Sequence, residues 1–165
     1  MLRQIKQLFE RKENGRPRIH DVAEPCSIEL DTSGSEDDLR RIREPMYASN
    51  IRKSGIGDYT PLNLLLKDAR STTVGGLIGS SHWGWLHVEL MWVDEAVRRR
   101  GLGRQLLLTA EKLARRRKCR HAWLETLSFQ GALPFYTSLG YVQFAVLEDY
   151  PEGHRKYFLR KDLGR

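Results

Sequence analysis

The chain is poor in cysteine and has no long apolar run. Cys26 and Cys119 are the only two cysteines among its 165 residues, and they form no C-x-x-C pair. Two such cysteines do not build a disulfide framework, and no cluster of His, Cys and Asp has metal-ligand spacing. No stretch approaches the ~20 apolar residues that a membrane helix requires. We therefore expect neither a bound metal nor a membrane partner.

The amino terminus lacks the marks of a targeting sequence. Its first 18 residues have no apolar core of the secretory type, and they include Glu10 and Glu13 but no serine. Neither a secretory signal nor a mitochondrial presequence is indicated, and we expect a cytoplasmic protein. Residues 2–11 carry apolar side chains at helical spacing, and residues 14–25 are mostly polar. We predict an extension over 1–25, a short helix plus a linker of disordered composition, before a single domain over 26–165.

Positive charge is concentrated in one stretch. The formal net charge is +7, and ten of the 28 lysines and arginines lie between Arg98 and Arg120 with a single acidic residue, Glu111. A basic surface of this kind raises nucleic acid as a partner. Part of it has a structural explanation, because the cations at 115–118 end a predicted helix, where each contributes about 0.3–1 kcal/mol. Nothing else requires nucleic acid, and we do not expect it.

Two common phosphate-binding motifs are absent. No G-x-x-x-x-G-K-[ST] string occurs, and the third glycine of G-x-G-x-x-G is missing because position 106 is Leu106. The chain has instead a basic glycine turn between an apolar strand and a leucine-rich helix. Small residues let a bulky anion approach the backbone, and the helix offers free N–H groups and the positive end of its dipole. This chemistry suits a pyrophosphate, with candidate contacts at Arg98, Arg99, Arg100, Gly101, Leu102, Gly103 and Arg104.

This turn, Arg-x-x-Gly-x-Gly, resembles the acetyl-CoA loop of the GNAT N-acetyltransferase superfamily. A second motif, Phe135-Tyr136-x-x-x-Gly140-Tyr141, resembles the signature that closes the GNAT core. The motifs stand in the family's order, and the resemblance covers roughly residues 61–163. It implies acetyl-CoA as cosubstrate, with Tyr136 near the coenzyme sulfur and Gln130 near the pantetheine arm. It also implies that the thioester carbonyl is polarised by backbone N–H groups around Met91, Trp92 and Val93.

Apolar periodicity predicts the elements of the fold. Strands are expected at 27–30, 61–67, 72–80, 85–93, 120–126, 141–147 and 156–160. Helices are expected from Ser33 or Ser35 to about residue 54, with a break near Pro45, and over 102–117 and 131–139. Hairpins followed by alternating helices and strands indicate an α/β fold. We predict a mixed, largely antiparallel sheet of about six or seven strands, flanked by helices on both faces, which is also the GNAT arrangement.

Two central strands carry the candidate bases. An extended strand over 85–93 places His87, Glu89 and Met91 on one face, and on the other Leu86, Val88, Leu90 and Trp92. Acetyl transfer to an amine needs a group that takes the ammonium proton. A glutamate inside a core strand is costly to bury unpaired, so Glu125 and Glu89 are expected to face a cleft or a partner. They are the candidate bases, with His87 or no dedicated base as alternatives.

Two further residues have a candidate role and a plain alternative. Tyr136 is the candidate acid that protonates the leaving thiolate, and the alternative is a buried core tyrosine. His154 follows a glycine in the last turn. It either borders the acceptor site or is an ordinary surface residue.

The sequence thus predicts an acetyl-CoA-dependent N-acetyltransferase, an enzyme that moves an acetyl group to a primary amine by direct attack in a ternary complex. We favour a small-molecule amine because no recognition domain is appended, with a protein lysine or amino terminus as the alternative. The rival is a non-catalytic module that senses acyl-CoA or binds nucleic acid through the surface between Arg98 and Arg120. The sequence leaves a homodimer open.

Overall fold

The computed structural model describes residues 28–164, in two parts, 28–44 and 45–164, and helix α2 (Glu36–Ser54) runs across the division. The predicted helix and linker within residues 1–25 lie outside the described residues. Helix α2 begins behind Ser35, whose hydroxyl accepts the Asp38 N–H at 3.4 Å, and three acidic residues fill its first turn. This start is as predicted. No helix in the described part of the chain is long and apolar enough to cross a membrane.

Two expectations in this region are wrong. Helix α2 continues through Pro45 without a break. Pro45 has no N–H to donate to the carbonyl of residue 41. Residue 41 is exposed, so water can donate to this carbonyl instead. Residues 28–30 form no strand, and the side chains of Ile28 and Leu30 are exposed. A strand needs a neighbour for its backbone hydrogen bonds, and none of the described strands pairs with this segment.

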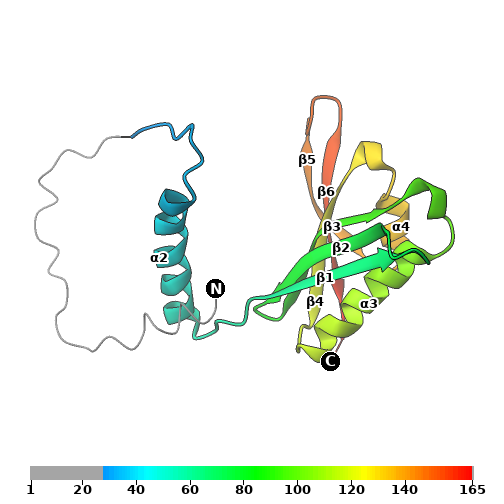
Figure 1. Cartoon of the computed structure of the whole chain (residues 1–165), viewed down its shortest axis with the longest axis horizontal. Helices are drawn as coiled ribbons and strands as arrows, with labels where there is room; N and C mark the ends of the chain where they lie inside the picture. The colour runs from blue at the N-terminus through cyan, green and yellow to red at the C-terminus, as the bar shows by residue number, and fades with distance from the viewer. Residues whose placement is uncertain (1–27, 165) are drawn as a thin grey trace, which may run out of the picture. The chain divides into compact units, whose positions relative to one another are not determined.

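Six strands form one mixed sheet in the order β1-β2-β3-β4-β6-β5 (Figure 1). The strands are β1 (Thr60–Lys67), β2 (Thr73–His82), β3 (Trp85–Val93), β4 (His121–Leu127), β5 (Val142–Glu148) and β6 (Arg155–Asp162). Only β3 and β4 run parallel, because helix α3 (Leu102–Arg116) connects them. All other neighbours are antiparallel. The predicted mixed, largely antiparallel sheet is confirmed.

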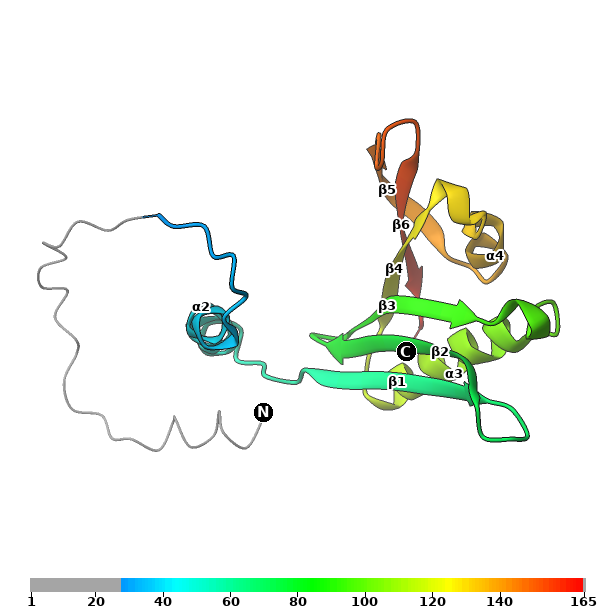
Figure 2. The same cartoon turned by 45° about the horizontal axis from the view of Figure 1, so that its top comes forward.

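One face of this sheet carries the core. Helix α3 lies along β1, β2 and β3, and the short helix α4 (Leu133–Ser138) joins the same buried cluster (Figure 2). Strand β4 alternates strictly: it buries Ala122, Leu124 and Thr126 on this face and leaves Trp123 and Glu125 on the other. The predicted apolar face of α3 is confirmed at Leu106, Leu107, Ala110 and Ala114. Helix cover on the second face stays a prediction.

Candidate active site

The two parallel strands separate halfway along their length. Their pairing runs from Trp85 and His121 only to Val88 and Leu124. The next residues, Glu89 on β3 and Glu125 on β4, are thus the first beyond the paired part. Over the rest of β3, the backbone groups that point away from β2 have no partner on β4. This opening between the central strands leaves N–H and C=O groups for a ligand.

A bulge in β3 lies at the same place. Val88 pairs with Gly79 and Leu90 with Ile78, so Glu89 is the extra residue in the ladder. The bulge reverses the alternation predicted for the end of the strand. Leu90 and Trp92 join the face of His87, where their side chains are 53% and 47% exposed, while Met91 packs against the core. The predicted faces are therefore right up to Glu89 and wrong for Leu90, Met91 and Trp92.

His87 lies between the two candidate bases on the face of the sheet opposite α3. Its Nδ1 is 4.0 Å from Glu89 Oε1, and its Nε2 is 3.7 Å from Glu125 Oε2. The imidazole stacks flat on the Trp123 indole, with 3.7 Å between ring centres and 3° between planes. Ser80 donates its hydroxyl to Glu89 Oε1 at 3.2 Å. The two candidate bases and their alternative, His87, thus form one cluster.

Sequence reasoning missed a fourth member of this cluster, Lys156. Its Nζ donates to Glu125 Oε1 at 2.9 Å, and it lies 5.2 Å from the centre of the Tyr150 ring and 5.5 Å from that of Phe158. Lys156 is on β6, which pairs with β4. No local pattern marks it, because the pairing of strands about thirty residues apart cannot be read from either strand alone.

The surroundings of His87 favour its neutral form. Burial lowers the pKa of His87 below its usual value, against the opposing effect of the Glu125 and Glu89 carboxylates, which raise it; His82 lowers it further. A neutral imidazole has one free nitrogen lone pair at physiological pH. The cluster can therefore accept a proton.

The glycine turn has the shape expected of an anion site. A short 3₁₀ helix, η1 (Glu95–Val97), follows β3 and is capped by Asp94. Arg99 and Gly101 then take left-handed conformations, with φ of 62° and 77°, and α3 begins. The first hydrogen bond of α3 runs from Gln105 N–H to Gly101 C=O at 3.0 Å, so the N–H groups of its first turn point outward unpaired within the helix. A Cβ built on Gly101 would meet no atom within 4 Å.

The predicted arginine contacts divide into two kinds. Arg98 shapes the turn itself, because its Nε donates to Val93 O at 2.8 Å and its Nη1 to Glu95 at 3.0 Å. Arg100 donates to Ala96 O at 3.3 Å. Arg99 and Arg104 are exposed beside the first turn of α3. These last two are the better placed for a phosphate.

The second motif lies against this turn. A Cβ built on Gly103 would lie 3.7 Å from the Phe135 ring and 4.0 Å from Val93, so the end of β3, the start of α3 and helix α4 meet. Tyr136, next to Phe135, is buried in the core, and burial raises the pKa of its phenol. The fold thus brings the two sequence motifs together at Phe135, and the neighbouring Tyr136 phenol keeps its proton at neutral pH.

Gln130 has a structural task in the short helix η2 (Ser128–Gln130) that follows β4. Its Oε1 accepts the Leu127 N–H and the Thr126 hydroxyl, both at 2.9 Å, which closes the end of the strand. The side chain is exposed, and its amide NH₂ stays available. Contact with the pantetheine arm stays a prediction.

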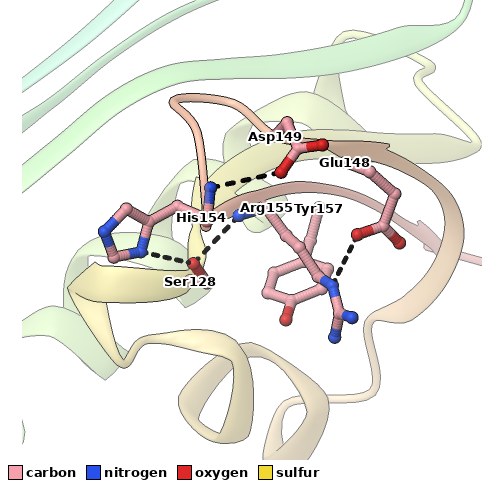
Figure 3. Close-up of a pocket in the computed structure, with 7 residues that line it drawn as sticks. Ser128, Glu148, Asp149, His154, Arg155 and Tyr157 are labelled. Atoms are coloured by element: carbon pink, nitrogen blue, oxygen red, sulfur yellow. Dashed lines mark hydrogen bonds and ion pairs between the residues drawn. The ribbon is translucent and has the colours of Figure 1, made fainter.

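A polar hollow of about 290 Å³ lies where the β5–β6 hairpin meets η2 (Figure 3). His154 lines it, and its Nδ1 is 3.5 Å from the Ser128 hydroxyl, which accepts the Arg155 N–H at 3.0 Å. Arg155 pairs with Glu148 at 2.7 Å. The hollow is open and lies at the rim of the sheet, so a role for His154 beside the acceptor stays a prediction.

Part of the basic stretch holds the fold together. Arg115 donates to Leu163 O at 2.7 Å, and Arg117 donates to the carbonyls of Thr60 and Pro61 and to the Ser81 hydroxyl. These contacts bind the end of α3 to strands β1 and β2 and to the carboxyl-terminal segment. These two arginines therefore have a structural role, and their charge does not require a nucleic-acid partner.

A mixed sheet whose parallel pair parts beside a glycine turn and a helix start has the architecture of an N-acetyltransferase. The sequence pattern of the acetyltransferase (GNAT) family matches residues 19–141. The chain belongs to this family.

Two acetyltransferases and a solved structure are similar to this chain over most of its length. Acetyltransferase Atu2258 of Agrobacterium fabrum is 34% identical over 122 residues, 74% of this chain and 88% of the relative. Blasticidin-S acetyltransferase of Streptomyces morookaense is 38% identical over 117 residues, 68% of this chain and 85% of the relative. A crystal structure of an acetyltransferase-like protein from Agrobacterium tumefaciens superposes with a TM-score of 0.78 at 31% identity, covering 83% of this chain and 99% of that one.

Proposed function

We propose that the chain transfers an acetyl group from acetyl-CoA to the primary amine of a small molecule, by direct attack in a ternary complex. The observation that carries this proposal is the cluster of Glu89, His87 and Glu125 at the point where β3 and β4 part. Two carboxylates attract an ammonium group, and a neutral imidazole between them can take its proton.

The coenzyme fits the turn and the opening beside it. Unpaired N–H groups and exposed arginines suit the pyrophosphate, and the backbone at Gly101 borders open space. The unpaired edge of β3 offers backbone donors over Met91, Trp92 and Val93 for the pantetheine arm and the thioester carbonyl. These residues and Gln130 are our proposed contacts.

The reaction divides between two groups of residues. The acceptor loses a proton to the cluster of Glu89, His87 and Glu125, and its nitrogen forms a bond to the acetyl carbon as the carbon–sulfur bond breaks. Tyr136, protonated because burial raises its pKa, gives its proton to the departing sulfur. The products are an amide and a free thiol, and solvent returns the proton from the cluster to the phenol.

The acceptor is a small cationic amine. The blasticidin-S acetyltransferase at 38% identity is named for a small molecule, and Glu89 lies beside two exposed apolar side chains, Leu90 and Trp92. A carboxylate next to an indole suits an ammonium carried on a compact organic scaffold.

Thiol release from acetyl-CoA tests the proposal across an amine panel. The panel holds blasticidin S, simple diamines, amino acids, and peptides with a free lysine or amino terminus. We expect turnover with a small amine and little with the peptides. Preferred turnover of a peptide would identify proteins as the acceptors. Acetyl-CoA binding without turnover of any amine would favour a non-catalytic module that senses acyl-CoA.

A further inference from the structure

We infer that Lys156 is a positioning residue that gives the two glutamates different tasks: it anchors Glu125 behind His87 and leaves Glu89 to meet the acceptor. The inference rests on the proposed function and deepens it, because it names the route of the proton. It makes His87 the base, with Nδ1 toward the acceptor and Nε2 toward Glu125.

The first step is the shared carboxylate of Glu125. One oxygen, Oε1, accepts from Lys156 Nζ at 2.9 Å, and the other, Oε2, faces His87 Nε2 at 3.7 Å. The side chains of Lys156 and Glu125 are only 20% and 28% exposed. A charge-assisted hydrogen bond in such a sheltered place holds the carboxylate in one orientation.

The second step is the restraint on Lys156 itself. Its ammonium lies near the Tyr150 and Phe158 rings, at 5.2 Å and 5.5 Å, and Phe158 is paired with Glu125 across the β4–β6 ladder. Rings and carboxylate together fix a side chain that is otherwise flexible. Lys156 is thus held on the side of Glu125 away from His87 Nε2.

The third step is the contrast with Glu89. Its side chain is 43% exposed, at the bulge beside the opening, and within residues 28–164 no lysine or arginine nitrogen lies within 4.0 Å of it. Its recorded partners are the Ser80 hydroxyl and the His87 ring. Glu89 is therefore the carboxylate with free capacity for an incoming ammonium.

The fourth step is the choice of nitrogen on His87. Nε2 is buried, and the group it faces is the anchored carboxylate of Glu125, whose Oε2 lies 3.7 Å away. A proton on Nε2 is favoured by that carboxylate, which leaves the lone pair on Nδ1, the nitrogen facing Glu89. The acceptor's proton passes from nitrogen to Nδ1, and the resulting imidazolium lies between two carboxylates. The stacked Trp123 ring keeps the imidazole plane in place.

The charged groups around His87 give the inference its sharpest consequence. Glu125 and Glu89 raise the pKa of His87, while burial and His82 lower it. The Lys156 charge offsets that of Glu125, so losing the lysine strengthens the pull of the carboxylate on the imidazole proton. Losing the Glu125 charge has the opposite effect.

The experiment measures the pH dependence of kcat/KM for the amine in the full chain. The acid limb of this profile is the pH range in which protonation of His87 lowers kcat/KM. We expect Lys156→Met to move this limb to higher pH by about one unit, an ordinary size for the loss of a neighbouring charge. Glu125→Gln should move it to lower pH. Lys156→Arg should stay near the original, and the double variant should fall between the singles. Lys67→Met, the same change on exposed β1, is the matched control and should leave the limb in place.

NMR titration of the His87 ring without substrate provides a second readout, with the signal assigned from a His87→Gln variant. It should shift in the same directions as the acid limb. Equal loss of rate at every pH in Lys156→Met, with an unmoved His87 titration, would reduce Lys156 to a structural role and overturn the inference. If no amine is acetylated by the unaltered chain, the proposed function fails, and the titration still decides whether Lys156 controls His87.

Discussion

The sharpest stability prediction concerns a buried ion pair that joins helix α3 to the sheet. Glu111, on α3, has a side chain only 1% exposed, and Lys161 Nζ on β6 donates to both of its carboxylate oxygens at 2.8 Å. Arg115 Nη2 is the next cation, at 3.7 Å. The Lys161→Met variant keeps the volume of the stem and removes the charge, which leaves a buried carboxylate whose nearest cation is Arg115 at 3.7 Å.

Removing one partner of a buried pair costs about 3–5 kcal/mol, because the other charge stays desolvated. At about 2–4 °C per kcal/mol for a chain of this size, Tm should fall by roughly 6–20 °C. Urea unfolding followed by circular dichroism measures the free energy directly. The control is Arg155→Met, which breaks the Glu148–Arg155 pair, whose side chains are 65% and 57% exposed; an exposed pair is worth about 0–1 kcal/mol.

A double variant separates the cost of leaving a buried charge unpaired from the cost of altered packing. Replacing Glu111 by Leu together with Lys161→Met removes both charges, and stability should recover to within about 1 kcal/mol of the original, since apolar residues of similar volume often replace a buried pair without loss. If Lys161→Met costs no more than Arg155→Met, the carboxylate is not in a low-dielectric site. The account of α3 held by a buried charge would then be refuted.

Three further predictions test the site and the core. Arg104→Asp should sharply weaken acetyl-CoA binding in calorimetry while Tm holds, because Arg104 is exposed in the first turn of α3, where an acid suits the helix but repels an anion; binding equal to that of Thr109→Asp, farther along α3, would move the site elsewhere. Tyr136→Phe should lower kcat by roughly 10–10³ with coenzyme affinity kept, within the range of losing a general acid; an unchanged kcat with chemistry rate-limiting would exclude the role. Burial raises the pKa of the Cys119 thiol, so in a Cys26→Ser variant a disulfide reagent should label it only on unfolding, and rapid labelling of the folded protein would contradict its burial.

Local features of the sequence were enough for most of the fold. The apolar spacing along α3 and the alternation along β1 and β2 are properties of single segments, and hairpins need little more than a turn between two such segments. The same holds for the glycine turn, since a left-handed residue and a helix start are encoded within a few positions. These patterns predicted the elements from Thr60 onward, the family and the shape of the glycine turn.

What the tertiary structure alone decided is how distant segments meet. The bulge at Glu89 changed which face Leu90 and Trp92 occupy, because one inserted residue reverses the alternation of every later side chain. Both lysines are on strand β6, and its position in the sheet pairs Lys156 with Glu125 on β4 and Lys161 with Glu111 on α3. Glu111 belongs to a helix face that looked apolar, and only a cation from another strand makes its burial tolerable. Register and pairing depend on both partners at once, so no single segment of the chain contains them.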